Sequence, residues 1–260
     1  AAILVGENPA SLIYVKNKAK ACQEMGMESE IIQLPESTSE KELLRQIESL
    51  NHKEEVHGIM VESPLPLHIN QFKVFAAVDV NKDVDGFNPY NLGLLFLGTP
   101  SFIPCTPLGI QELLIRSGND PTGKNVVILG RGNIVGKPLA ALLIQKAKGA
   151  DATVTICHTG TKNLAEITKT ADILVAAIGK ANFVTAEMVK AGAVVVDVGI
   201  NWIKDSASNK SKIAGDVEFE SVSKIAGAIT PVPGGVGPMT IAMLLNNTIK
   251  AAEMQNGIKD

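Results

Sequence analysis

One stretch predicts the fold, and from Val126 to Pro138 it reads VVILGRGNIVGKP. Its first four residues are apolar and strand-like, they run directly into Gly130, and a helix is expected to open near Gly136. Glycines allow a tight turn and a close approach of the backbone to a pyrophosphate, and the N–H groups of the helix face that anion. We therefore predict a Rossmann-like dinucleotide site. Its expected cofactor contacts are Gly130, Arg131, Gly132, Ile134, Val135 and Gly136.

The glycine spacing alone does not decide what kind of site this is. It reads GxGxxxG, one residue longer than the common dinucleotide pattern, so an ordinary tight strand-to-helix turn is the alternative. A P-loop is excluded, because only three residues separate Gly132 from Gly136 and because Pro138 follows Lys137 where Ser or Thr is required.

The residues after the next strand, Thr153–Cys157, bear on the choice of cofactor. An NAD site commonly places an acidic residue there to hold the ribose 2′-hydroxyl, but this chain continues with His158, Thr159, Gly160, Thr161 and Lys162. Hydroxyl and cationic groups suit a 2′-phosphate, so the sequence favours NADP over NAD, with His158 and Thr159 among the contacts. The alternative is that Thr159, Thr161 and Lys162 only cap the helix that follows.

Outward from this stretch, strands and helices alternate along the whole chain. Upstream, apolar runs predict strands at Ala2–Val5, Glu30–Leu34 and Gly58–Val61, separated by helices over Pro9–Met25 and Ser39–Leu50. This βαβαβ order is typical of a parallel sheet with crossover helices. A stretch from Asp79 to Pro107 is expected to be loop-rich.

Downstream, a second series of strands and helices follows. It ends in a near-continuous apolar strand at Val194–Val198 and a last helix from about Pro238 to Met254. We predict an α/β protein of two domains with a cleft between them. The first would span residues 1–107, with the final helix, about 239–260, packing back on it, and the Rossmann-like domain would span residues 108–238.

The composition fits a globular chain and excludes several classes of protein. Hydrophobic residues make up 45% of the 260 residues and charged residues 20%, which excludes extended disorder. The net charge of −3 argues against a nucleic-acid surface. No apolar run reaches the roughly 18–20 residues of a membrane span.

Cysteines and histidines give no sign of a disulfide or a metal. Cys22, Cys105 and Cys157 lie far apart, and we expect reduced thiols in a cytoplasmic protein. The four histidines have no metal-ligand spacing, so no metal is expected. The first residues lack the features of a signal peptide and begin abruptly with a strand-like run.

Several motifs together resemble one enzyme family. They are GENPASLIYVKNK, VESPLPLHI, NKDVDGFNPYN, PCTP, GRGNIVGKP, GDVEF and ITPVPGGVGPMT, in this order along nearly the whole chain. The chain thereby resembles bifunctional methylenetetrahydrofolate dehydrogenase/cyclohydrolases, although the N-terminal helical segment usual in that family is absent from it. The resemblance implies NADP-dependent oxidation of 5,10-methylenetetrahydrofolate to 5,10-methenyltetrahydrofolate and hydrolysis to 10-formyltetrahydrofolate. It also implies a cytoplasmic homodimer that serves one-carbon metabolism and purine biosynthesis.

The same resemblance assigns a folate site to the first domain. Tyr14 and Lys18 share a helix face, which alone suggests an ordinary surface pair. The resemblance implies that Tyr14 packs on the folate rings and that Lys18 reaches the reacting carbon as a catalytic base. The residues around Asp85 alone suggest an Asp-Gly turn with solvated carboxylates. The resemblance implies that Asp85 accepts hydrogen bonds from the pterin.

Two positions depart from the family pattern. Glu62, after Val61, stands where the family usually carries Gln. A carboxylate close to Lys18 would favour its ammonium form and weaken it as a base, or Glu62 could take the proton itself. Gly132 stands where many relatives carry Ser, which removes a hydroxyl donor to the cofactor and weakens the preference for NADP.

A glycine- and proline-rich motif completes the predicted site. Its chain chemistry also fits a rigid hinge between domains. The resemblance puts it between nicotinamide and folate, with Ile200 and Thr240 as cofactor contacts. The folate contacts expected in the motif are Pro233, Gly234, Gly235, Gly237, Pro238 and Thr240, together with Val61 and the residues named above.

Three alternatives stay open from the sequence. The chain could be a dehydrogenase that lost the hydrolytic activity with Glu62. It could be a dehydrogenase for another substrate, of the amino-acid or shikimate type. It could also be a non-catalytic regulator that binds the nucleotide.

Overall fold

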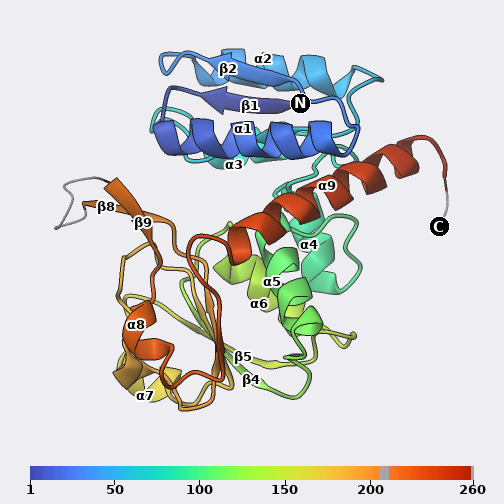
Figure 1. The fold of residues 1–260 in the computed structure, drawn as a ribbon. Coiled ribbons are helices and arrows are strands. Elements are labelled where there is room, and N and C mark those ends of the chain that lie inside the picture. Colours follow the sequence, from blue (N-terminus) through green and yellow to red (C-terminus); the bar gives the residue numbers. More distant parts are fainter. Residues whose placement is uncertain (205–210, 259–260) are drawn as a thin grey trace. The chain divides into compact units, whose positions relative to one another are not determined.

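The computed structural model describes residues 1–204 and 211–258, in which strands and helices alternate except at α3–α5 and β7–β9 (Figure 1). The chain divides into two structural units. Unit 1 comprises Ala1–Cys105 and Ile241–Asp260, and unit 2 comprises Thr106–Thr240. The last helix, α9 (Val236–Gln255), therefore begins in unit 2 and continues in unit 1.

Unit 1 is built on a three-stranded parallel sheet with the order β2-β1-β3. Its strands are β1 (Ala2–Val5), β2 (Ile31–Leu34) and β3 (Met60–Val61). Its other helices are α1 (Pro9–Glu24), α2 (Glu40–Asn51), α3 (Gln71–Ala77) and α4 (Pro89–Leu97). The central strand β1 is buried along its whole length, as expected for a parallel strand covered on both faces.

Local sequence signals account for where two helices of unit 1 begin. Ser39 accepts the N–H of Glu42, whose side chain accepts the N–H of Ser39, and this capping box confirms the helix predicted from Ser39. Asn8 accepts the N–H of Ser11 at the start of α1. The third strand is shorter than predicted, and its pairing ends before Pro64 and Pro66.

The stretch Asp79–Pro107, predicted to be loop-rich, contains helical structure that the sequence analysis did not predict. Helix α4 lies inside it, with Asn88 as the N-cap and Pro89 at the first helical position, and α5 (Cys105–Arg116) begins before its end. Both are recognised start signals of a helix, which the many turn-forming residues around them obscured.

Unit 2 is built on a five-stranded parallel sheet with the order β10-β7-β6-β4-β5. The strands are β4 (Asn125–Leu129), β5 (Thr153–Cys157), β6 (Ile173–Ala176), β7 (Val194–Asp197) and β10 (Ala228–Ile229). The chain passes from β4 to β5 on one side and then crosses to β6 on the other. This reversal creates a topological switch point at the carboxyl ends of β4 and β6, which is where open α/β sheets bind ligands.

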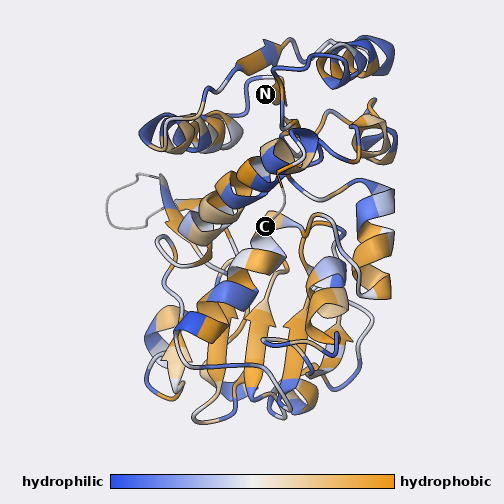
Figure 2. Ribbon diagram, turned by 90° about the vertical axis from the view of Figure 1, so that its right-hand side faces the viewer, coloured by the Kyte–Doolittle hydropathy of each residue, from blue (hydrophilic) through white to orange (hydrophobic). Residues whose placement is uncertain are grey.

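The sheet of unit 2 has a core on each face. Val127 and Leu129 belong to one buried cluster and Val126 and Ile128 to the other, because successive side chains of a strand point to opposite faces. The strands of this sheet are coloured as hydrophobic in Figure 2. The shorter elements are α6 (Gly136–Leu143), α7 (Leu164–Thr168), the 3₁₀ helix η1 (Ala186–Met188), β8 (Asn201–Lys204), β9 (Ser211–Ala214) and α8 (Phe219–Val222).

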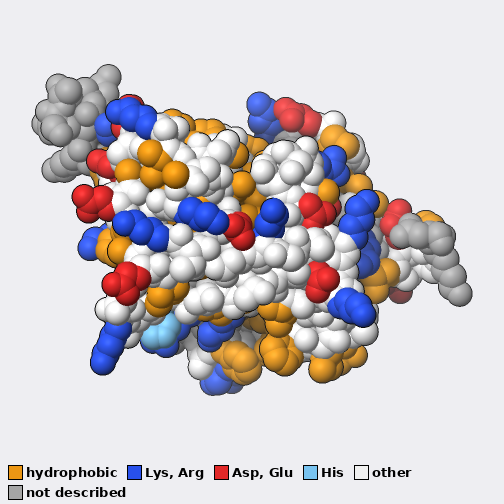
Figure 3. All heavy atoms as spheres, turned by 90° about the horizontal axis from the view of Figure 1, so that it is seen from below, with side chains coloured by type: hydrophobic (Ala, Val, Ile, Leu, Met, Phe, Trp, Pro, Cys, Tyr) orange, Lys and Arg blue, Asp and Glu red, His pale blue; other side chains and the backbone are white. Residues whose placement is uncertain are grey.

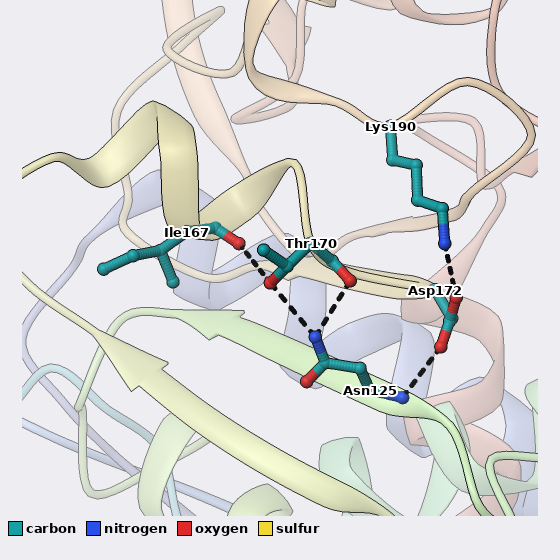
Figure 4. Close-up of polar contacts among 5 residues, drawn as sticks. All are labelled: Asn125, Ile167, Thr170, Asp172 and Lys190. Atoms are coloured by element: carbon teal, nitrogen blue, oxygen red, sulfur yellow. Dashed lines mark hydrogen bonds and ion pairs between the residues drawn. The ribbon is translucent and has the colours of Figure 1, made fainter.

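Polar contacts link the amino ends of strands in this sheet, opposite the switch point at their carboxyl ends (Figure 4). Asp172 accepts the N–H of Asn125 at 2.9 Å and the Nζ of Lys190 at 2.8 Å. The Asn125 amide donates to the carbonyl and hydroxyl oxygens of Thr170. These contacts tie the starts of β4 and β6 together, while the glycine-rich loops lie at the opposite edge.

The surface shows no concentration of one charge on the face drawn in Figure 3, where basic and acidic side chains are interspersed. This agrees with the small net charge of the sequence. Among the described residues, no helix has the length and apolar character needed to cross a membrane.

Candidate active site and cofactor loops

Four residues predicted from the first domain lie together in unit 1. The Nζ of Lys18 donates to Oε2 of Glu62 at 3.0 Å and lies 4.4 Å from the centre of the Tyr14 ring. The side chains of Lys18 and Glu62 are only 8% and 9% exposed, so this ion pair is shielded from water. Asp85 is partly buried and interacts electrostatically with both of them.

Secondary structure positions three of these side chains. Tyr14 and Lys18 lie one turn apart on α1, which puts them on the same face of the helix. Glu62 directly follows β3, and its N–H donates to the carbonyl of Ile3, so the parallel pairing continues one residue beyond Val61 and orients Glu62.

Asp83, which sequence reasoning did not single out, shapes the turn that carries Asp85. Its carboxylate accepts the N–H groups of Phe87 and Asn88 and the side-chain amide of Asn91. Burial raises the pKa of Asp83 to about 6, against the opposing effect of these hydrogen bonds. The sequence signal was the pair of aspartates in DVDG, of which the resemblance pointed only to the second.

Asn247 of α9 supports the same turn and was also missed. Its amide donates to the carbonyl of Val84 at 2.9 Å and to that of Ile103 at 3.0 Å, and the side chain is buried. Gly86 in this turn packs closely against the backbone of Pro104, because a Cβ at position 86 would lie 2.7 Å from the Pro104 nitrogen. Nothing local in the sequence links residue 247 to this turn.

The electrostatics of the cluster keep Lys18 charged. Burial lowers the pKa of Lys18, but Asp85 and Glu62 together outweigh that effect and raise it above its ordinary value. Burial raises the pKa of Glu62, and Lys18 opposes this shift. Burial likewise raises the pKa of Asp85 against the pull of Lys18. The site therefore holds an ammonium that is paired with one carboxylate, Glu62, and interacts electrostatically with a second, Asp85.

The predicted glycine loop lies between β4 and α6 in unit 2. Gly130 has a φ of +117°, and a Cβ there would lie 2.1 Å from the carbonyl oxygen of Ala177. A Cβ on Gly136 would lie equally close to the carbonyl oxygen of Gly130, whereas Gly132 has open space around it. Two glycines thus form the turn and the third leaves room for a ligand. The helix begins at Gly136, as predicted.

The loop after β5 lies next to the glycine loop, because β4 and β5 are neighbours with their carboxyl ends at one edge. The hydroxyl of Thr161 accepts the N–H of His158, and Nδ1 of His158 accepts the N–H of Gly160. The N-cap of α7 is Asn163, so Thr161 shapes this loop and does not cap the helix. Thr159 and Lys162 are exposed, as is Arg131 in the glycine loop.

Two buried aspartates order the remaining loops at this edge. Asp197, at the end of β7, accepts the N–H groups of Gly199, Asp216 and Val217. Asp216 in turn accepts three successive N–H groups, from Ile178 to Lys180, and the amide of Asn201. Ile200 lies in this segment and is exposed. The motif GDVEF contains Asp216, but the sequence did not reveal its role.

The glycine- and proline-rich motif forms the connection between β10 and α9 and the first turn of that helix. Gly234 has a φ of +104° with open space around it, and Gly237 is also open, so a ligand could approach the backbone closely at both. A Cβ on Gly235 would lie 2.6 Å from the carbonyl of Pro231. The hydroxyl of Thr240 pairs with that of Thr106 at 3.1 Å. The predicted contacts Pro233 and Pro238 belong to the same segment.

No group of three His, Cys, Asp or Glu side chains within residues 1–204 and 211–258 is arranged to hold a metal ion. The three cysteines are free thiols.

A five-stranded parallel sheet with a glycine-rich turn at its switch point defines unit 2 as a Rossmann-type dinucleotide-binding unit. Unit 1 adds a second α/β sheet with a buried lysine–carboxylate cluster. The chain belongs to the tetrahydrofolate dehydrogenase/cyclohydrolase family. Residues 1–85 match the catalytic domain of that family, and residues 104–256 match its NAD(P)-binding domain.

Known proteins of this family are similar over nearly the whole chain. The bifunctional protein FolD of Chlorobium chlorochromatii is 57% identical over 98% of this chain and 88% of its own length. The crystal structure of the FolD methylenetetrahydrofolate dehydrogenase/cyclohydrolase of Campylobacter jejuni is 52% identical with a TM-score of 0.90, covering 97% of this chain and 87% of its own. The Trypanosoma brucei enzyme, complexed with NADP cofactor and inhibitor, is 39% identical with a TM-score of 0.91, covering 97% and 86%.

Proposed function

We propose that this chain oxidises 5,10-methylenetetrahydrofolate with NADP⁺ and then hydrolyses 5,10-methenyltetrahydrofolate to 10-formyltetrahydrofolate. The observation that carries the proposal is the buried cluster of Tyr14, Lys18, Glu62 and Asp85, in a chain whose relatives are named for both activities. Because the chain belongs to the tetrahydrofolate dehydrogenase/cyclohydrolase family, we favour a folate substrate over one of the amino-acid or shikimate type.

The loops of unit 2 fit a phosphorylated dinucleotide. Open space at Gly132 lets a pyrophosphate approach the backbone, and the exposed Arg131 supplies a cation beside it. NADP would accept the hydride from the one-carbon unit of the folate. The residues assigned to hold it are Gly130, Arg131, Gly132, Ile134, Val135, Gly136, His158, Thr159, Ile200 and Thr240.

The preference for NADP over NAD rests on the loop after β5. This loop carries Thr159 and Lys162 with no acidic side chain from His158 to Lys162, so a 2′-phosphate would meet no opposing charge there. The NADP complex of the Trypanosoma brucei relative supports the same choice.

Folate binding is assigned to unit 1 together with the glycine- and proline-rich motif. Tyr14 offers a ring face for stacking, and Asp85 offers a carboxylate to the N–H donors of the pterin. The other assigned contacts are Lys18, Val61, Glu62, Pro233, Gly234, Gly235, Gly237, Pro238 and Thr240.

The hydrolytic step requires that a proton leave the water that attacks the methenyl carbon. Because the pKa of Lys18 is raised, its ammonium is the resident form, and it can donate hydrogen bonds but cannot take this proton. Glu62 is held 3.0 Å from Lys18 and is the carboxylate best placed to accept it. The reaction consumes one water and releases one proton when the carbon–N5 bond opens.

Loss of the hydrolytic activity is the second candidate, and the same ion pair favours it. If Lys18 must be neutral for hydrolysis, Glu62 holds it in the wrong form. The chain would then be a dehydrogenase only.

Turnover of methylenetetrahydrofolate with NADP⁺ and with NAD⁺, followed by absorbance alongside the decay of added methenyltetrahydrofolate, tests both candidates. Turnover with accelerated decay is the expected result, and turnover without accelerated decay favours the dehydrogenase alone. The absence of turnover with either nucleotide would overturn the proposal and leave a nucleotide-binding regulator.

The variant Lys18→Met is expected to lose hydrolysis while it retains part of the dehydrogenase activity, because only hydrolysis needs the charged group at the reacting carbon. Lys20→Met is the matched control, since Lys20 lies on the same helix with its side chain 75% exposed. Equal loss of both activities in a folded Lys18→Met variant would contradict the assigned role.

The cell context is part of the proposal. The three free thiols and the resemblance support a cytoplasmic protein, and the family resemblance supports a homodimer that serves purine biosynthesis. Sedimentation of the purified chain tests the dimer.

A further inference from the structure

One cation serves two carboxylates at the candidate active site. Lys18 forms the 3.0 Å ion pair with Glu62 and also interacts with Asp85, and Glu62 and Asp85 repel one another. When all three groups are ionised, the cluster has a formal net charge of −1. An amide at position 62 would leave the cluster neutral, with one carboxylate for one ammonium.

The groups packed around the cluster do not offset this charge. Tyr14 on α1 carries no positive charge, and burial raises the pKa of the Cys105 thiol at the start of α5 well above its ordinary value, so the thiol is neutral. Asp83, on the same turn as Asp85, adds negative charge when ionised, and its carboxylate is already hydrogen-bonded by the turn. Asn247, from α9, is uncharged.

The proposed ligands differ in charge at the one-carbon bridge, which the proposed function places beside Lys18. The one-carbon bridge of methylenetetrahydrofolate is neutral, removal of hydride leaves a cation delocalised over N5, the bridging carbon and N10, and hydrolysis restores a neutral formyl group. The pterin, the aminobenzoate and the glutamate tail are the same in all three. An excess negative charge in the protein therefore favours only the methenyl form.

We propose that Glu62 is a specificity-determining residue that makes this site prefer the cationic methenyl folate over its neutral precursor and product. The inference rests on the proposed folate function and deepens it. The ion pair fixes Glu62 beside Lys18, and the excess charge holds the intermediate in the site between oxidation and hydrolysis. For an assumed separation of about 8 Å and an effective dielectric constant of about 20, a unit charge changes the dissociation constant of a cation about thirtyfold.

The test compares two ligands in the wild type and in Glu62→Gln. Methenyltetrahydrofolate is the cationic probe, with its dissociation constant measured by stopped flow before hydrolysis, and tetrahydrofolate, which has no bridge, is the neutral probe. Glu62→Gln is expected to weaken methenyl binding about thirtyfold and to change tetrahydrofolate binding less than about twofold. Glu62→Asp, which retains the charge, is expected to keep most of the preference.

The pH dependence separates a charge effect from a structural one. In the wild type, the preference for the cation should fall as the pH is lowered through the pKa of Glu62, because protonation removes the excess charge. In Glu62→Gln this pH-dependent change in the preference should be missing. Any change that comes from protonation of Asp85 or Asp83 should remain in both proteins. Circular dichroism of the variants shows that they are folded.

Two results would overturn the inference in distinguishable ways. If the wild type binds both ligands but folded Glu62→Gln retains the same ratio of the two dissociation constants, the specificity role of Glu62 is wrong and the proposed function stands. If the wild type binds neither ligand, the proposed function and this inference fail together.

Discussion

Replacement of Asp216 by Asn should destabilise unit 2 far more than an isosteric change usually does. The Asp216 side chain is fully buried and its carboxylate accepts four hydrogen bonds. One oxygen receives the N–H groups of Ile178 and Gly179, at 2.7 and 2.9 Å, and the other receives the Lys180 N–H and the Asn201 amide, both at 2.9 Å. An asparagine has only one oxygen, so its NH₂ group must face two donors.

The magnitude follows from those two donors. A buried donor left without a partner costs about 1–3 kcal/mol, and hydrogen bonds to a charged acceptor lie at the strong end of the range. Two such losses give an expected decrease of about 3–5 kcal/mol in the free energy of unfolding of unit 2. This is a large share of the roughly 5–15 kcal/mol typical of a domain.

Urea unfolding followed by the fluorescence of Trp202 measures this decrease. Trp202 is the only tryptophan of the chain, is half exposed and directly follows Asn201, one of the partners of Asp216. The control is Asp172→Asn, because Asp172 also bonds a backbone N–H but pairs with Lys190 at the surface, where about 1 kcal/mol is expected. A loss in Asp216→Asn no larger than in this control would refute the reasoning.

Two further predictions concern unit 2. The hydrogen bond from Lys190 holds the pKa of Asp172 below its ordinary value of 3.8, so the pair stabilises the fold above that pH and the effect is lost as the pH falls through the lowered pKa. Lys190→Ala should raise the pKa of Asp172, measured by NMR. The variant should lose about 0.5 kcal/mol of unfolding free energy at neutral pH and none near pH 2. An unchanged pKa of Asp172 would contradict this prediction. Gly130→Ala should lower the free energy of unfolding, measured in urea, by about 3 kcal/mol or more, because its Cβ would lie 2.1 Å from the Ala177 carbonyl oxygen. Gly132→Ala, the control, should change it by less than about 0.5 kcal/mol, because Gly132 has open space around it. Similar losses in both variants would contradict the assigned turn.

Short-range patterns explain why much of the fold could be predicted. The capping box of Ser39 and the apolar run that ends at Gly130 each involve residues close in sequence, and their geometry follows from local sterics and hydrogen bonding. Helix α4 was missed although Asn88 and Pro89 mark its start, because the surrounding turn residues suggested a loop. Between Ile200 and Ile229 the sequence alone predicted no element, and β8, β9, α8 and β10 occupy parts of it.

The site could be predicted only where a motif identified it. Lys18 and Glu62 are 44 residues apart, and no periodicity links them, so their ion pair followed from the resemblance. The same holds for Asn247, whose amide reaches Val84 across 163 residues and was not foreseen. Contacts of this kind depend on how whole elements pack, and a single sequence carries no local signal for them.

The carboxylates of this chain separate into two roles by the number of donors that each one meets. Asp216 is saturated by four hydrogen bonds and Asp197 accepts three of the about four that a carboxylate can take, so both act by fixing loops. Among the described residues, Glu62 and Asp85 have only Lys18 to compensate their charge, so part of that charge remains to act on whatever binds beside them. An unsaturated carboxylate in a shielded site is unfavourable for folding alone, and a cationic ligand would offset this cost in stability. The same argument predicts that Glu62→Gln, while it weakens the binding of the methenyl cation, leaves the folded chain as stable as the wild type or more so.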